Sequence, residues 1–406
     1  MSSNAVIVAA RRSPIGRAGK GSLAQMRPDE LAHQVLAATL ESVPELDPET
    51  IDDIHIGCAQ AAGEAGYNLA RVLAVLGGLD GVPGTTVNRY CSSSLQTTRM
   101  AYHAIRAGEA DVVVSGGVET VSRHVHGRAD GMPDTHNSRF EEAGQRTKLL
   151  AAGEGIWTDP RRTDELPDLY IGMGQTAENV AQAYGVSRAD QDEFAVLSQR
   201  RAVGAARTGF WAREIAPVTL PDGTVVTADD GPRPGTTLEK LAALTPVFRE
   251  QGTVTAGNCC PLNDGAAMLM VMGEDKARAL GCTPLARIVA TSVSALSPEI
   301  MGMGPVEATR RVLDRAGLIM ADIDLVEMNE AFAAQVLACQ RELDIPLDRL
   351  NVNGGAIALG HPFGMTGARI TTTLINSLRT HDKQFGLETM CVGGGQGMAM
   401  VIERLH

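Results

Sequence analysis

The sequence predicts an α/β fold in which two similar halves follow one another and a lid segment interrupts the first of them. Three observations support this prediction. Short apolar segments alternate with segments of helical spacing, which is typical of mixed, mostly parallel sheets covered by helices. The last third of the chain repeats the order of segments in the first third. Residues 122–249 differ from both, because they are rich in charge, glycine and proline and contain both tryptophans.

The repeat consists of five pairs of segments that occur in the same order in both halves. In the first pair, Ala5-Val-Ile-Val8 corresponds to Ala286-Arg-Ile-Val289. The other pairs are the helical segments from Asp29 and from Val306 to Ala316, then 54–56 with 324–327, 87–90 with 352–355, and 112–117 with 390–395. One such match occurs easily by chance, whereas five in order indicate a duplication. Duplicated β/α halves would form two packed sheets with helices around and between them.

These observations place the N-terminal half at residues 1–121 plus 250–272, the lid at 122–249 and the C-terminal half at 273–406. Within the lid, the segment from Ser187 to Thr208 has the spacing of an amphipathic helix. Its opening run, Ser-Arg-Ala-Asp-Gln-Asp-Glu, carries the serine and acidic residues that satisfy free N–H groups in a first helical turn.

Composition argues against several classes of function. The chain has 406 residues, is 44% hydrophobic and carries a net charge of −12, which argues against nucleic acid as a partner because phosphate binding requires a basic surface. No apolar run reaches membrane-spanning length and no signal peptide precedes the first strand, so we expect no membrane partner. The seven cysteines include no C-x-x-C pair. Free thiols in a reducing, cytoplasmic protein without a bound metal are therefore predicted.

Two cysteines lie where a reactive thiol is expected. Cys91 stands at a strand-to-helix junction and is followed by three serines. A helix N-terminus lowers the pKa of a thiol and raises its nucleophilicity at neutral pH. Cys391 stands at a strand end before Val-Gly-Gly-Gly-Gln-Gly397, whose backbone N–H groups can hold a developing oxyanion. Taken singly, each fits a structural cysteine as well, Cys91 in the core and Cys391 beside a tight turn.

A histidine and an asparagine are the other candidates. The run from Asn353 to Gly367 holds five glycines in fifteen residues, which indicates close approach of the backbone to another group or positive φ angles. His361 lies within this run and is a candidate general base, because histidine usually fills that role near neutral pH. Asn329 follows a strand and opens a helix. The simpler alternatives are a structural histidine and a helix N-cap.

Together, these segments resemble the thiolases, the acyl-CoA C-acyltransferases. The matching runs stand in the order of that family and span nearly the whole chain: Val87–Ser93, Gly116–Thr120, Met173–Val180, Gly257–Ala267, Asn329–Phe332, Asn353–Gly367 and Cys391–Gly395. The resemblance implies the family's α/β fold, in which two βαβαβαββ halves form a layered α-β-α-β-α core with an inserted lid.

The resemblance also implies a ping-pong acyl transfer. Cys91, its proton taken by His361, would become S-acylated, which divides one difficult step into two easier ones. Cys391 would remove the α-proton of acetyl-CoA, or return one to the enolate during thiolysis. Two oxyanion sites are implied. One consists of His361 and a water held by Asn329, and the other of the N–H groups of Cys91 and Gly393.

Coenzyme A is the implied co-substrate, with no permanently bound cofactor. Arg233 is the expected phosphate contact, and the stretch Ala256–Pro261 corresponds to the lining of the pantetheine tunnel. Many thiolases have a serine where this chain has Cys260, so the hydrogen bond expected there to the pantetheine amide is in question. Met173 and Phe332 are further expected substrate contacts. Since adjacent cysteines form strained disulfides, Cys259 and Cys260 are expected to remain free thiols.

The acyl chain is the least determined part of the resemblance. Short-chain thiolases often carry His-Met where this chain has Gly172-Met173, and loss of that histidine would widen the acyl pocket. The stretch Val125 to Pro167 also differs from the usual short-chain lid. These features favour a degradative enzyme that cleaves 3-ketoacyl-CoA, as in fatty-acid β-oxidation. A biosynthetic acetoacetyl-CoA thiolase is the alternative. A homodimer or homotetramer is implied in either case.

Two other classes of protein share parts of this pattern. A ketoacyl synthase would use one cysteine with two histidines, or with a histidine and an asparagine, whereas the second cysteine before glycines favours a thiolase. A non-catalytic acyl-CoA or lipid-binding relative would lack the catalytic set. Here all four side chains of that set, Cys91, Asn329, His361 and Cys391, are present.

Overall fold

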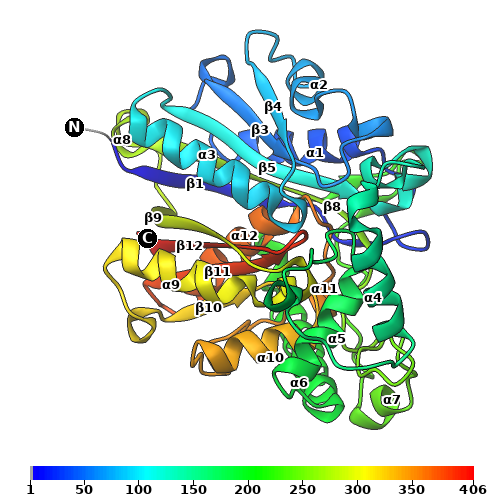
Figure 1. The fold of residues 1–406 in the computed structure, drawn as a ribbon. Helices are drawn as coiled ribbons and strands as arrows, with labels where there is room; N and C mark the ends of the chain where they lie inside the picture. The colour runs from blue at the N-terminus through cyan, green and yellow to red at the C-terminus, as the bar shows by residue number, and fades with distance from the viewer. Residues whose placement is uncertain (1–2) are drawn as a thin grey trace.

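The computed structural model describes residues 3–406 as five layers (Figure 1). Helices α1 and α2 cover the outer face of one sheet region, and α9 and α10 cover the outer face of the other. Helices α3 and α12 contact each other and lie between the two regions. The strand order is β10-β11-β12-β9-β1-β8-β5-β3-β4, and β2 pairs with β8. The layered arrangement expected from the sequence is confirmed.

The N-terminal half contributes six strands and three helices. The strands are β1 (Ala5–Arg12), β2 (Gly16–Arg17), β3 (Asp53–Gly57), β4 (Gly84–Val87), β5 (Val112–Thr120) and β8 (Asn263–Gly273). The helices are α1 (Pro28–Glu41), α2 (Leu69–Leu76) and α3 (Ser93–Ala107), and α8 (Glu274–Leu280) follows β8 at the start of the C-terminal half. Strand β8 follows the lid in sequence and pairs with both β1 and β5, so the chain returns to the sheet that it left.

The C-terminal half is built in the same order. Its strands are β9 (Ala286–Ala295), β10 (Leu325–Met328), β11 (Phe385–Val392) and β12 (Gln396–Arg404). Its helices are α9 (Gly304–Ala316), α10 (Ala333–Glu342), α11 (Ala356–Leu359) and α12 (Thr366–Thr380). The counterpart of β4 is reduced to a single bridge between Val326 and Leu350. The glycine-rich run that follows this bridge is therefore free of strand geometry.

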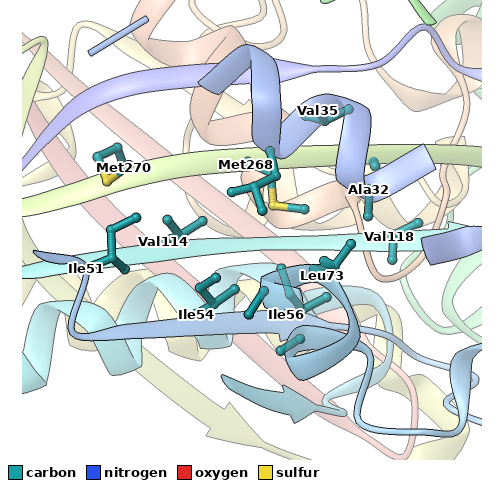
Figure 2. Packing of buried hydrophobic residues seen from close by; sticks show 14 of the residues in the cluster. Ala32, Val35, Ile51, Ile54, Ile56, Leu73, Val114, Val118, Met268 and Met270 are labelled. Carbon is teal, nitrogen blue, oxygen red and sulfur yellow. The ribbon is translucent and has the colours of Figure 1, made fainter. Parts of the chain in front are cut away.

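Strand residues divide between the layers because successive side chains of a strand point to opposite faces. Val114 and Met268 pack under α1 and α2, and Figure 2 shows them with Val35 and Leu73 of those helices. Val113 points to the other face and joins the cluster around α3 and α12. Both faces of the sheet are thus apolar, and the strands read as continuous apolar runs.

Two expectations about the sheets are wrong. Within residues 3–406, only the pairings β3–β4, β3–β5 and β10–β11 are parallel, and the remaining pairings are antiparallel. The long strands β8 and β12 run in the opposite direction to the strands on either side of them, so their pairings are antiparallel. The two sheet regions are also not separate, because β1 and β9 pair at Val6–Arg287 and Ile7–Ala286.

The lid contains more regular structure than the sequence indicated. It holds α4 (Glu141–Ala151), α5 (Met173–Ala183), α6 (Arg188–Arg207), α7 (Leu238–Ala242) and the short pair β6 (Val218–Thr219) and β7 (Val225–Val226). The expected amphipathic helix is α6, where Ser187 Oγ accepts from Asp190 N and Asp190 Oδ2 accepts from Ser187 N. No helix in the described range is long and apolar enough to cross a membrane.

A buried ion pair fastens the lid to the core. Arg12, at the end of β1, donates from Nε to Glu214 Oε1 at 2.6 Å and from Nη1 to Asp229 Oδ1 at 2.7 Å. Burial opposes the charge of Arg12, but Asp229 and Glu214 outweigh it and raise the pKa of the guanidinium. Because both acidic residues belong to the lid, these bonds fix the position of the lid relative to β1.

Candidate active site

Cys91 lies in a strained turn between β4 and α3. Tyr90, just before it, has a φ of 44° and is 42% exposed, in a region that non-glycine residues rarely enter. Three hydrogen bonds hold the turn: Tyr90 N donates to Asn88 Oδ1 at 2.8 Å, Arg89 N to Ser93 Oγ at 2.9 Å, and Ser93 Oγ to Tyr90 O at 2.7 Å. Strain of this kind persists only where the surroundings enforce it, and it is frequent at functional sites.

The expected fall in the pKa of the Cys91 thiol is wrong. Burial raises that pKa to about 11, while the backbone N–H groups of Gly393 and of Cys91 itself lower it. Desolvation therefore outweighs the two donors. The thiol is protonated at neutral pH, so its activation requires a base. Two backbone N–H groups, one from each half of the protein, thus favour the thiolate of a single cysteine.

His361 is held on two sides by hydrogen bonds. Its backbone N–H donates to Asn263 Oδ1 at 3.0 Å, and its Nδ1 lies 2.6 Å from Thr366 Oγ1. Thr366 Oγ1 donates its own proton to Pro362 O at 2.7 Å. Because that hydroxyl proton is already committed, Thr366 can only accept from His361, and this network assigns the imidazole proton to Nδ1. Nε2 then carries the free lone pair.

The other ring nitrogen faces Asn329. Asn329 Nδ2 lies 3.3 Å from His361 Nε2, and both side chains are buried. Burial, with the charge of Arg369 as a second cause, lowers the pKa of His361 to about 3. The imidazole is thus neutral at neutral pH, and its Nε2 carries no proton. Asn329 Oδ1 is buried and has no hydrogen-bond partner in residues 3–406.

The expectation that Asn329 opens a helix is wrong. It follows β10, but α10 begins at Ala333 and its N-cap is Phe332. The side chain of Asn329 is therefore not used as a cap. It is available to His361 and to a further donor.

Cys391 lies near the end of β11, which turns through three glycines into β12. It pairs with Gly397, and Gly394 and Gly395 adopt φ angles of 76° and 78° that favour glycine. Cys391 is fully buried, and burial, followed by the nearby Cys91 thiol, raises its pKa well above the usual value. Both candidate cysteines are thus protonated thiols in each other's vicinity.

An apolar cluster surrounds Cys391. Its buried members are Ala177, Val254, Met301, Ala331, Phe332 and Cys391, with Met173, Phe248 and Cys259 packed against them. The rings of Phe248 and Phe332 meet edge to face with centroids 6.2 Å apart. Two of the expected substrate contacts, Met173 and Phe332, therefore lie together beside Cys391. They come from the lid and from the C-terminal half.

The remaining expected contacts lie on two loops. Cys260 N donates to Ala331 O at 3.0 Å, so its loop runs beside the segment that follows Asn329. Ala256 is exposed, and both Cys259 and Cys260 are free thiols, as expected. Burial raises the pKa of Cys260 well above the usual value, with Cys259 and Cys91 as further causes. Arg233 is exposed on the lid, where partial desolvation by neighbouring atoms and the nearby Arg17 lower its pKa.

Two buried acids that the sequence interpretation did not single out connect the loops of the site. Glu119 Oε2 accepts from Ala59 N at 2.8 Å and from Gly364 N at 2.9 Å. Glu330 accepts from Ser198 Oγ at 2.6 Å and from Ile357 N at 3.1 Å. The sequence signal for both residues is a carboxylate within a glycine-rich or apolar run. A carboxylate in such a run is expected to be buried, and a buried carboxylate requires hydrogen-bond donors.

No cluster of His, Cys, Asp and Glu side chains in the described part of the chain is arranged to hold a metal ion. The site itself offers thiols, an imidazole, an amide and backbone N–H groups. These groups suit formation of a thioester and stabilisation of an oxyanion.

Comparisons with known proteins agree with this arrangement. The chain matches the family "Thiolase, N-terminal domain" over residues 5–275 and the family "Thiolase, C-terminal domain" over residues 282–404. It is 46% identical to the 3-oxoadipyl-CoA/3-oxo-5,6-dehydrosuberyl-CoA thiolase of Escherichia coli K12, covering 97% of this chain and 98% of that protein.

Two solved structures have the same fold. The acetyl-CoA acetyltransferase of Bacillus anthracis superposes with a TM-score of 0.85 at 40% identity, covering 100% of this chain and 99% of the other. The dimeric peroxisomal thiolase of Saccharomyces cerevisiae superposes with a TM-score of 0.88 at 34% identity, covering 100% and 98%. Fold, site and relatives together define an acyltransferase. The chain belongs to the thiolase family.

Proposed function

We propose that the protein cleaves a 3-oxoacyl-CoA with coenzyme A and forms acetyl-CoA and a shortened acyl-CoA through an S-acyl-Cys91 intermediate. The observation that carries this proposal is the contact between the turn of Cys91 and the glycine hairpin, where a Cβ on Gly393 would lie 3.4 Å from Tyr90 and the Gly393 N–H lowers the pKa of the Cys91 thiol. A carbonyl carbon attacked by that sulfur has its oxygen close to two backbone donors. Donors of this kind are each worth roughly 10²–10³ in rate when an oxyanion forms.

In the first half-reaction, His361 Nε2 takes the proton of Cys91, and the sulfur attacks the 3-oxo carbon. The oxyanion is held by the N–H groups of Cys91 and Gly393. When the C2–C3 bond breaks, its electron pair forms the enolate of acetyl-CoA, whose oxygen is held by His361 and by a water bound to Asn329. Cys391 gives its proton to C2, and acetyl-CoA leaves. These roles use the neutral His361 and the protonated Cys391 described above.

In the second half-reaction, the Cys391 thiolate takes the proton of coenzyme A. The CoA sulfur attacks the acyl group on Cys91, and the same two N–H groups hold the second oxyanion. The shortened acyl-CoA leaves, and Cys91 recovers its proton from His361. The cycle thus returns every group to its starting protonation state. Exposed Arg233 and Ala256, together with Cys260, are the proposed contacts of CoA.

For the substrate, we propose 3-oxoadipyl-CoA in place of the fatty-acid-derived chain expected from the sequence. The support is the 46% identical relative, whose name includes that compound. Cleavage would give acetyl-CoA and succinyl-CoA. Acetoacetyl-CoA is the second candidate, because the neighbour from Bacillus anthracis is an acetyl-CoA acetyltransferase.

A thiolysis panel tests the substrate. Purified protein and CoA would be given 3-oxoadipyl-CoA, 3-oxohexanoyl-CoA or acetoacetyl-CoA, and kcat/KM would be measured for each. 3-Oxoadipyl-CoA and 3-oxohexanoyl-CoA both have a six-carbon acyl chain, but only the first ends in a carboxylate. We expect 3-oxoadipyl-CoA to be preferred by about tenfold or more, which corresponds to one or two additional polar contacts. Preference for acetoacetyl-CoA would favour the second candidate, and no cleavage of any of the three would contradict the proposed function.

We also propose a homodimer or homotetramer. Strand β4 ends the strand order, and all four of its residues are partly exposed. Tyr67, near this edge, is 87% exposed, which is unusual for a large apolar side chain. An unpaired, partly apolar edge favours pairing with another chain. Light scattering after gel filtration would give the mass, and a monomer at micromolar concentration would contradict the proposal.

A further inference from the structure

The two N–H groups at the Cys91 thiol come from different halves of the protein. The Cys91 N–H belongs to the turn after β4, and the Gly393 N–H belongs to the hairpin between β11 and β12. An oxyanion site works only when its donors are held at the right spacing before the charge develops. Some contact between the turn and the hairpin must therefore fix that spacing.

Arg89 makes such a contact. Its Nε donates to Gln96 Oε1 at 3.0 Å, on α3, and its Nη1 donates to Gln396 Oε1 at 2.8 Å, on β12. Gln396 Nε2 in turn donates to Gly393 O at 3.2 Å. A chain of hydrogen bonds thus runs from the residue two before Cys91 to the residue that carries the second N–H.

The chemistry of these residues suits a rigid connection. The guanidinium is planar and directs its donors in fixed directions, so one side chain can hold two acceptors at a set distance. Both acceptors are amide oxygens, and a hydrogen bond from a charged donor is stronger than one between neutral groups. Burial lowers the pKa of Arg89, which shows that its charge is held at a cost. The strained Tyr90 lies directly after it and needs such support.

We propose that Arg89 and Gln396 are positioning residues that set the distance between the Cys91 and Gly393 N–H groups and thereby control the chemical step. This inference rests on the proposed function. Neither residue is assigned contact with the substrate. Their loss should slow acyl transfer and leave substrate binding nearly unchanged.

The test measures formation of acyl-Cys91 from acetyl-CoA by rapid-quench mass spectrometry, with KM and kcat of acetoacetyl-CoA thiolysis in parallel. We expect Arg89→Met and Gln396→Leu each to slow acylation by about 10²-fold, the usual cost of one oxyanion donor, with KM within about threefold of wild type. The double variant should be no slower than the slower single variant, because both residues act through one connection. Arg89→Lys, which lacks the planar fork, should resemble Arg89→Met.

Arg99→Met is the matched control. Arg99 lies close to Arg89, as the effect of Arg89 on its pKa shows, but its Nε is buried without a hydrogen-bond partner in residues 3–406. Its removal changes the local charge and leaves the connection intact, so acylation should stay within about twofold of wild type.

Alkylation of Cys91 by iodoacetamide forms no oxyanion and reports whether the nucleophile is intact. It should fall far less than acylation in both positioning variants. Gln396 lies outside the turn, so Gln396→Leu still tests the inference if Arg89→Met disturbs the turn itself. Acylation at the wild-type rate in Gln396→Leu, or effects of the two changes that multiply in the double variant, would overturn the inference. No acyl-Cys91 in the wild type would instead overturn the proposed function, and this inference with it.

Discussion

The turn at Cys91 and the loop at His361 occupy corresponding places in the two halves, yet they are built differently. The turn follows a full strand, β4, and includes a non-glycine residue at positive φ, Tyr90. The loop follows only a bridge at Leu350 and relies on glycines, among them Gly360 at a φ of 118°. The turn is partly exposed, whereas the loop is buried. One copy of the repeat thus presents a nucleophile, and the other holds a rigid base.

The burial of the loop explains its glycines. A Cβ on Gly360 would lie 2.5 Å from the side chain of Asn263, and one on Gly364 would lie 2.4 Å from Val118 O. Both neighbours belong to strands of the N-terminal half. The loop of one half is therefore packed into the other half, and that contact brings His361 to the side of the molecule where Cys91 lies. Duplication produced two complementary parts in place of two equal sites.

The largest expected effect is on catalysis and distinguishes the role of Cys391 from that of Cys91. Cys391→Ala should lower the rate of carbon–carbon bond cleavage by about 10²–10⁴-fold, the usual contribution of a general acid or base. Acylation of Cys91 by acetyl-CoA should continue, because the CoA thiolate is a good leaving group and can depart without the proton of Cys391. Thiolysis rates and acyl-enzyme mass spectra measure the two effects. Cleavage at a near wild-type rate would remove Cys391 from the mechanism.

The next effect concerns the orientation of His361. Thr366→Val removes the acceptor for Nδ1–H and should lower kcat on the order of 10–100-fold, less than loss of the base itself. Thr366→Ser keeps the hydroxyl and is the matched control, with activity close to wild type. ¹⁵N NMR of the imidazole should show Nδ1–H in the wild type. A wild-type imidazole protonated at Nε2 would contradict the assigned network.

A smaller effect, on stability, is expected from one backbone substitution in the loop and one in the turn. Gly360→Ala combines a positive φ with a steric clash and should destabilise the protein by about 1–3 kcal/mol. Tyr90→Gly removes the strain of a non-glycine residue at positive φ and should change stability by less than about 1 kcal/mol. Urea unfolding measures both. Equal losses would show that the turn and the loop are under similar constraint.

The effect that is smallest per pH unit is on the pH dependence of stability. The folded protein keeps His361 neutral down to a pKa of about 3, whereas the unfolded chain takes up that proton near pH 6.5. The unfolded state thus binds more protons between these values, so stability falls as the pH falls from about 6.5 to 3. His361→Asn should reduce this slope by up to about 1.4 kcal/mol per pH unit. An unchanged slope in urea titrations would mean that His361 is charged in the folded protein.

Local pattern predicted much of this structure. Helices α1, α3, α6 and α9 follow from their spacing, and the glycines around His361 indicated close packing. The pairing direction of β12 did not follow, because it depends on a three-glycine hairpin and not on the strand itself. Helices α4 and α5 were missed because the lid is rich in charge and turn residues.

The contacts that define the site were beyond sequence interpretation. Arg89 meets Gln396 across 307 positions and Arg12 meets Asp229 across 217, and no local signal connects either pair. The pKa of Cys91 was misjudged for a related reason. The helix N-terminus is visible in sequence, whereas burial of the thiol is a property of the folded chain. Packing against residues distant in the sequence buries the thiol and raises its pKa, which outweighs the lowering expected from the helix N-terminus.

The proposed mechanism depends first on acylation of Cys91, which can be observed directly. The wild-type protein, Cys91→Ala and Cys391→Ala would each be mixed with acetyl-CoA in the absence of free CoA, digested and analysed by mass spectrometry. The proposed mechanism predicts an acyl adduct on Cys91 in the wild type and none on any cysteine in Cys91→Ala. It predicts an adduct on Cys91 in Cys391→Ala as well. An adduct on Cys260 or Cys391 in the wild type, or no adduct at all, would contradict it.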